Sequence, residues 1–199
     1  MRILVVGGFG TIGSKVSAHF QSNNEVVIAG RSTGDITVDI ADSSSIKSMF
    51  EKSGKFDALI CIAGNSKWDD FYNLTEEDYY IGLKSKLMGQ VNLVRIGQHY
   101  LTPNGSITLT TGILADDPVV KTTSAALVNG GIHSFVKAVS LEIANGIRVN
   151  VVAPGLVEDS YEKLKDYFPG HIPVPMSKVV KAYERSVQGK DAGQIIRIY

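Results

Sequence analysis

Short apolar runs rich in β-branched residues alternate with longer segments of helical periodicity along the whole chain. The apolar runs predict buried strands, and in chain order they read RILVV, EVVIA, ITV, DALICIA, SITLTT, IRVNVVA and GQIIRIY. Helices are expected between them, over residues 11–22, 43–53, 75–101 (one long helix or two joined ones), 123–144 and 176–188. Strands that are apolar on both faces need a covering layer on each side. The alternation therefore predicts an α/β fold, a doubly wound parallel sheet with helices on both faces.

The composition fits one compact domain and excludes several kinds of partner. The 199 residues are 44% hydrophobic and carry a formal net charge of zero, so no basic field is available to recruit nucleic acid or an anionic membrane. No apolar run is long enough to span a bilayer, and MRILVVGG reads as a first strand rather than a signal peptide. Cys61 is the single cysteine, which excludes an internal disulfide, and no spacing of His, Cys and Asp suggests a metal site. We expect a cytoplasmic protein with one domain over residues 1–199.

A glycine cluster in VVGGFGTIGSKVS directly follows the first predicted strand and opens the first predicted helix. Gly8, Gly10 and Gly13 satisfy G-x-G-x-x-G, and Gly7, Gly10 and Gly13 satisfy G-x-x-G-x-x-G. Glycines let the backbone approach a pyrophosphate, and the helix N-terminus offers free N–H groups and the positive end of a dipole. The alternative is a tight strand–helix turn without a ligand. We predict a dinucleotide site over the whole turn: Gly7, Gly8, Phe9, Gly10, Thr11, Ile12 and Gly13.

The end of the second predicted strand indicates which dinucleotide is bound. An acidic residue there would bind the ribose 2′-hydroxyl of NAD, but the strand ends IAGRST, with Arg31 followed by the hydroxyls of Ser32 and Thr33. Because a guanidinium can bind a 2′-phosphate bidentately, the sequence favours NADP(H) over NAD(H). The alternative is a solvated arginine. Farther on, Asp39 in TVDIAD is expected either to accept a hydrogen bond from the adenine amino group or to serve a turn or helix cap.

Several segments resemble the short-chain dehydrogenase/reductase family, and the resemblance covers nearly the whole chain. GGFGTIG is similar to the family's glycine motif, and VDIAD, which contains Ile40, is similar to its adenine-pocket segment. CIAGNS resembles the family's N-N-A-G turn, with Ala63 and Gly64 matching and other residues replacing both asparagines. GIRVNVVAPG, which ends in Pro154 and Gly155, resembles the sixth strand and its Pro-Gly turn, and GQIIRIY the closing strand. The resemblance implies a Rossmann-type sheet of about seven strands, a bound nicotinamide dinucleotide and a homodimer or homotetramer.

The four catalytic residues of that family are not found at the matching positions. The family uses an asparagine, a serine and a Y-x-x-x-K pair, in which the tyrosine protonates the substrate oxygen and the lysine holds the ribose. Here the tyrosine position falls on Ala125, the lysine position on Asn129, the serine position on Gly112 and the asparagine position on Lys86. Ala125 cannot transfer a proton, so the chemistry, if retained, needs another donor.

Three residues are the candidates for a replacement catalytic site. Lys86 would hold the ribose or act as an acid with a depressed pKa, although a surface lysine is an equal alternative. Thr111 would orient the substrate oxygen, or it is a threonine of ordinary strand propensity. Asn129 would bind the ribose through its amide, or it makes a hydrogen bond between helices or to a loop.

The segment over residues 156–175 resists the strand–helix pattern and is predicted to be a lid or substrate loop. Its Tyr161, Tyr167 or His171 would supply a proton from the opposite side of the pocket, or the aromatic rings pack the segment onto the sheet. Trp68, with Asp69 and Asp70, would line the same cleft or belong to a solvated loop. The expected function is an NADP(H)-dependent oxidoreductase acting on a small carbonyl or alcohol. The alternative is a non-catalytic NADP(H)-binding protein that senses redox state or regulates a partner.

Overall fold

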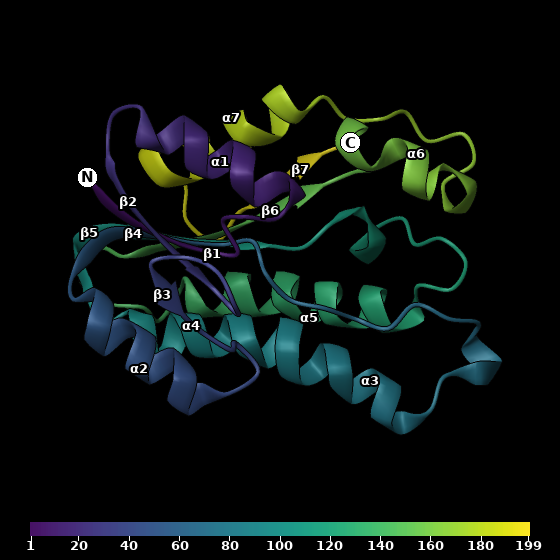
Figure 1. Ribbon diagram of the computed structural model, residues 1–199, viewed down its shortest axis with the longest axis horizontal. Helices are drawn as coiled ribbons and strands as arrows, with labels where there is room; N and C mark the ends of the chain where they lie inside the picture. The colour runs from purple at the N-terminus through teal and green to yellow at the C-terminus, as the bar shows by residue number, and fades with distance from the viewer.

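The computed structural model describes residues 1–199 and contains one seven-stranded sheet in the order β3-β2-β1-β4-β5-β6-β7 (Figure 1). Every neighbouring pair of strands is parallel. The strands are β1 Arg2–Val6, β2 Glu25–Gly30, β3 Ile36–Thr37, β4 Phe56–Cys61, β5 Leu101–Thr110, β6 Arg148–Pro154 and β7 Ile195–Ile198. The predicted doubly wound parallel sheet is confirmed.

Helices cover both faces of the sheet, and each face has its own core (Figure 1). On one face lie α1 (Thr11–Gln21) and α7 (Met176–Gln188), which bury Phe20 and Tyr183 completely. The other face carries α2 (Ser43–Ser53), α4 (Gly89–Gly97) and α5 (Thr123–Val139). Because β1, β4 and β6 are buried from both sides, their sequences are mostly apolar and show no regular alternation.

The expected helix over residues 75–101 is divided into three parts and is shorter than predicted. It consists of α3 (Glu76–Gly82), a π-helical segment (Leu83–Met88) and α4, which ends at Gly97. β5 begins at Leu101, five residues before the predicted SITLTT run, because Leu101 pairs with Phe56 across a register shift. The sequence pattern did not predict this first part of the strand, because the proline and glycine in LTPNG are typical of a turn. α5 likewise ends at Val139 instead of residue 144, before a turn in which Asn145 and Gly146 have positive φ.

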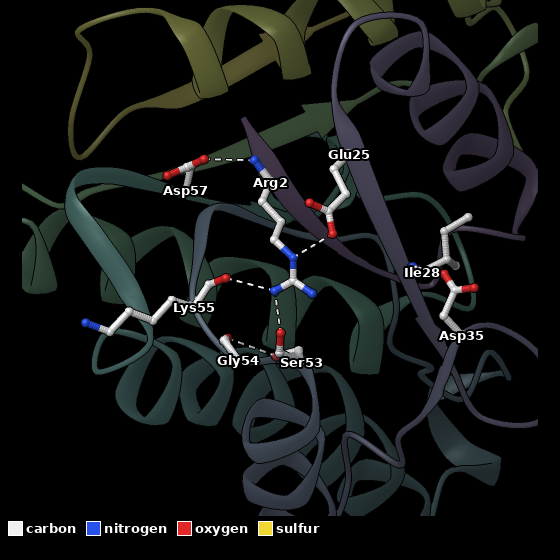
Figure 2. A network of polar contacts seen from close by, with 8 residues as sticks. All are labelled: Arg2, Glu25, Ile28, Asp35, Ser53, Gly54, Lys55 and Asp57. Carbon is white, nitrogen blue, oxygen red and sulfur yellow. Dashed lines mark hydrogen bonds and ion pairs between the residues drawn. The ribbon is translucent and has the colours of Figure 1, made fainter.

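The amino-terminal edge of the sheet is held by a polar network around Arg2 (Figure 2). Its guanidinium donates to Glu25 at 2.8 Å and to the carbonyl oxygens of Ser53 and Lys55, and its backbone N–H donates to Asp57 at 2.8 Å. These bonds fix the starts of β1, β2 and β4 relative to one another. The opposite, carboxyl edge of the same strands carries the cavities described below, so structural and candidate functional polar groups lie at opposite ends of the sheet.

No helix combines the length and apolar character needed to cross a bilayer. No group of three or more His, Cys, Asp or Glu residues is arranged to hold a metal ion.

Candidate active site

The turn between β1 and α1 is shaped so that only glycine fits at its critical positions. Gly7 has φ +85°, and a Cβ there would lie 2.6 Å from the carbonyl oxygen of Ile62. A Cβ on Gly13 would overlap the carbonyl oxygen of Gly7. α1 begins at Thr11 without a side-chain cap at Gly10 and without an acidic residue in its first turn. The first N–H groups of α1 are therefore free to bind an anion.

The first cavity opens at this turn, at the carboxyl ends of β1, β2 and β4, and has a volume of about 360 Å³. This is the point where the chain crosses from one half of the sheet to the other, the usual ligand position in open α/β sheets. The glycine cradle and the uncapped helix start fit a dinucleotide pyrophosphate. The cavity is lined by Gly7, Gly8, Phe9, Gly10, Gly30, Arg31, Thr33, Val38, Asp39, Ile40, Ile62, Ala63, Gly64, Asn65 and Ser85.

Arg31 and Asp39 form an ion pair at the rim of the first cavity. The guanidinium lies 3.2 Å from the carboxylate, and the two side chains are 68% and 45% exposed. The N–H of Ala41 and then Arg31 hold the pKa of Asp39 below its ordinary value. An ion pair this exposed contributes little stability, so Arg31 is available to a bound anion. Ser32 is exposed and does not line the cavity, whereas Thr33 does.

A second cavity of about 210 Å³ adjoins the first, and the three catalytic candidates meet there. Ser85 lines the first cavity and the next residue, Lys86, lines the second. Thr111 reaches it from the end of β5, and Asn129 from α5. Ile12, Pro154 and Gly155, expected beside the cofactor, also line this second cavity. Its other lining residues are Ser66, Trp68, Gly112, Ile113, Leu114, Ala125, Leu156, Val157, Ser160, Leu164 and Phe168.

Lys86 is positioned by the π-helical segment and by a glycine packed against its stem. A Cβ on Gly64 would lie 2.9 Å from the Cα, Cβ and Cγ of Lys86. The two segments of the backbone can therefore pack this closely only because residue 64 has no side chain. The ammonium forms no ion pair, and burial lowers its pKa to about 8. The adjacent Lys84 is exposed, with its Nζ 5.6 Å from the centre of the Tyr80 ring. Lys86 could therefore act as an acid near neutral pH.

Asn129 is 2% exposed, and its Oδ1 has no hydrogen-bond partner. An unpaired buried oxygen is costly, and here it lies at the wall of a cavity. Cys61, which is near enough to interact with Lys86, is completely buried, and burial raises the pKa of its thiol to about 12. The thiol stays protonated, as expected for a buried apolar residue, and cannot compensate the charge of Lys86.

Thr110 and Thr111 point to opposite faces of the sheet, as consecutive strand residues do. Thr110 is bonded on the α7 side, with its Oγ1 2.7 Å from the hydroxyl of Tyr183. Thr111 lines the second cavity and its Oγ1 lies 2.8 Å from Nε2 of His133.

Residues 156–175 fold over the second cavity through a small apolar cluster. Leu156 and Phe168 are buried with Ile113 and Leu114, and Trp68 packs edge-on against Tyr167 with ring centres 5.8 Å apart. Tyr161 and Tyr167 pack against this cluster, and neither lines the cavity. His171 instead lies 3.1 Å from Asp117, and Asp70 pairs with Lys121. The aromatic residues of this segment are placed as packing groups.

The sequence pattern missed two residues beside the second cavity. Asp116 lies in the turn after β5, where its carboxylate accepts hydrogen bonds from Arg197 and Tyr199 and lies 3.9 Å from Nδ1 of His133. His133 belongs to a pattern, because Ala125, Asn129 and His133 follow one another at four-residue spacing on α5. That spacing places them on one helix face and was the available signal.

Comparisons with known proteins agree with this geometry. The family model described as enoyl-(acyl carrier protein) reductase matches residues 12–181. The protein lin1944 from Listeria innocua has a solved structure with a TM-score of 0.98 and 43% identity, and the match covers 100% of both chains. A small-chain dehydrogenase crystallised in complex with NADPH has a TM-score of 0.87 and 29% identity, over 100% of this chain and 96% of that one.

Among curated proteins, the oxidoreductase UcpA of Escherichia coli (strain K12) is 28% identical over 132 residues, which are 61% of this chain and 49% of UcpA. The chain thus spans about half the length of the first curated relatives that it matches. Because the family model covers most of the sequence, the chain belongs to the short-chain dehydrogenase/reductase family.

Proposed function

We propose that the chain is an NADP(H)-dependent oxidoreductase that acts on a small carbonyl or alcohol through a non-standard catalytic site. The observation that carries the proposal is the pair of adjoining cavities. The first is a glycine cradle with an arginine at its rim, and the second is an apolar chamber into which Lys86, Thr111 and Asn129 converge.

The residues of the first cavity are suited to NADP(H). Free N–H groups at the start of α1 would bind the pyrophosphate, and Arg31 would bind the 2′-phosphate. Ile40 and Val38 offer an apolar wall for the adenine. A relative of 29% identity crystallised with NADPH supports the same choice.

The residues of the second cavity would control the substrate oxygen. When bound, the nicotinamide supplies or accepts the hydride. Lys86 would donate a hydrogen bond to the ribose or to the substrate oxygen, and its pKa near 8 makes it able to release a proton. The amide of Asn129, whose oxygen has no partner, would bind the ribose or the carboxamide. The nine hydrophobic lining residues would favour a small substrate with an apolar surface.

Residues 156–175 would serve as the substrate lid over this chamber. Val157 and Val174 form an isolated parallel bridge that ties the two ends of the segment together. Leu164 and Phe168, between them, line the cavity. A loop closed at its base and apolar underneath is suited to admit a small molecule and then exclude water.

A non-catalytic NADP(H)-binding protein is the second candidate. It is favoured by Ala125, which lines the second cavity at the position of the family's tyrosine, and by the lack of any tyrosine among the lining residues. Both candidates require the nucleotide, and only the first requires turnover.

Two measurements test these proposals. Calorimetric titration with NADPH and NADH should show tighter binding of NADPH. Arg31→Ala should weaken the binding of NADPH by about 10- to 100-fold, the effect expected when a charged hydrogen-bonded contact is lost. The affinity for NADH should stay nearly unchanged. Arg95→Ala, which removes another exposed arginine, is the matched control. Oxidation of NADPH in the presence of benzaldehyde, cyclohexanone and an enone should occur only if the first candidate is correct.

A further inference from the structure

A buried chain of polar side chains leads away from the second cavity through Thr111. The Thr111 and His133 side chains are connected at 2.8 Å, and each residue is only 6% exposed. On the far side of the ring, Nδ1 of His133 lies 3.9 Å from Oδ2 of Asp116. The order from cavity to surface is thus the Thr111 hydroxyl just after β5, the His133 imidazole on α5 and the Asp116 carboxylate in the turn that follows β5.

Asp116 is held firmly in this position by the end of the chain. Arg197 donates two hydrogen bonds to it, at 3.0 and 3.1 Å, and the Tyr199 hydroxyl donates a third at 2.5 Å. Arg197, and next Tyr199, lower the pKa of Asp116 to about 2, so the group is a carboxylate at every physiological pH. A fixed negative charge beside Nδ1 favours the imidazole tautomer with its proton there. Nε2 is then left to accept the Thr111 hydroxyl proton.

Building on the proposed function, we propose that Thr111 is the catalytic residue that exchanges a proton with the substrate oxygen and that His133 is the positioning residue that stores this proton behind it. Asp116 sets the tautomer of His133. These three residues would together supply the proton that the family's tyrosine supplies, which the methyl side chain of Ala125 cannot do.

The proton balance is complete in both directions. Carbonyl reduction adds a hydride at carbon, contributed by the dihydronicotinamide, and a proton at oxygen. The oxygen takes the Thr111 hydroxyl proton as the C=O π pair moves onto it, and Oγ1 takes a proton from Nε2 of imidazolium His133. A proton from solvent restores the imidazolium. In alcohol oxidation the hydroxyl proton passes to Oγ1 while Thr111 gives its own to neutral His133.

The protonation state of His133 therefore decides whether the site supports carbonyl reduction or alcohol oxidation. Burial lowers the pKa of His133 from its ordinary 6.5; Asp116 opposes this effect, while Arg197 and Lys137 add to it. Lys86 is the titratable residue that lines the second cavity, which His133 reaches only through Thr111. Carbonyl reduction should rise as pH falls through the pKa of His133, because the imidazolium is the donor. Alcohol oxidation should rise as pH increases through the same value.

Nuclear magnetic resonance of the cofactor-free protein tests the inference without turnover. Imidazole ¹⁵N shifts should identify the neutral form of His133 as the Nδ1–H tautomer, and Asp116→Asn should lower its pKa further. A neutral Nε2–H tautomer would overturn the proposal, because Nε2 could then not accept the Thr111 proton. This result is independent of whether any substrate is reduced.

Kinetics with benzaldehyde and benzyl alcohol supply the second test. Thr111→Val and His133→Gln should each lower kcat by about 100-fold, the usual scale of a lost proton donor, with NADPH affinity unchanged. Thr111→Ser should retain most activity, and His99→Gln, at an exposed position, should behave as the parent protein. If the parent turns over and His133→Gln keeps both kcat and the pH profile, the inference fails while the proposed function stands. If NADPH binds but neither probe is converted, the proposed function fails on these probes and the tautomer measurement alone decides the inference.

Discussion

Replacing Lys86 with methionine should make the cofactor-free protein more stable at neutral pH. The side chain carries an ammonium into an apolar cavity, and no ion pair or hydrogen bond compensates its charge. Methionine keeps most of the stem that packs against Gly64 and removes the charge. A residue retained against such a penalty is typical of a functional site.

The magnitude follows from the pKa of Lys86, which burial lowers from 10.5 to about 8. The difference corresponds to about 3 kcal/mol, and since the residue is only partly buried we expect about 1–2 kcal/mol after solvent screening. Below pH 8 both the folded and unfolded chains hold the proton, so the folded state carries the full penalty. Between pH 8 and 10.5 the unfolded chain binds more protons, so the stability of the parent rises and its deficit relative to Lys86→Met disappears.

Urea denaturation of both proteins at several pH values between 7 and 10.5 measures this difference directly. Lys84→Met is the matched control, since that lysine is exposed two residues away, and it should change the free energy of unfolding by no more than about 0.5 kcal/mol. A Lys86→Met protein that is less stable than the parent at pH 7, or a difference that does not depend on pH, would show that the ammonium is solvated or paired.

Three further changes test the cradle, the sheet edge and the lost catalytic pair. Gly13→Ala should lower the free energy of unfolding by about 1–3 kcal/mol and abolish NADPH binding in calorimetry, because its Cβ meets a backbone oxygen; Gly130→Ala, with open space around it, should do neither. Asp57→Asn should lower the free energy of unfolding, measured by urea denaturation at pH 7, by about 1–2 kcal/mol. The hydrogen bond from the Arg2 N–H is the main cause of the lowered pKa of Asp57, so the difference between the two proteins should vanish as pH falls below 3.8 and through that pKa. Ala125→Tyr combined with Asn129→Lys should raise benzaldehyde turnover at some expense in stability, whereas Ala125→Phe with the same lysine should not.

Most of the fold follows from local pattern, and the exceptions have identifiable causes. The strands of the sheet centre were predictable because burial on both faces makes them continuous apolar runs. The start of β5 was not, since Leu101 joins β4 only through a bulge that admits LTPNG. The π-helical turn at Leu83–Met88 was equally hidden, because its sequence has no proline or glycine to mark a change of helical winding.

The candidate site divides in the same way. The glycine turn could be recognised because its backbone demand is local: a positive φ at Gly7 and no room for a Cβ at Gly13. The contact between Thr111 and His133 joins residues 22 positions apart, and that between Asp116 and Arg197 joins residues 81 positions apart. Contacts between residues so far apart in the sequence leave no periodic pattern, so they become visible only in the folded structure.

The face of α5 explains how the family's chemistry could be replaced without a change of fold. Ala125 and Asn129 stand one turn apart where a tyrosine and a lysine would stand, and His133 follows one turn later. Emptying the first position leaves room in the second cavity, and the third position reaches that cavity only through the hydroxyl of Thr111. The source of the proton would thus lie two turns farther along the same face of α5, at His133, and would act through Thr111. Substrates that need little protonation at the moment of hydride transfer should consequently be least affected by loss of His133, and those with the most basic oxygen should be affected most.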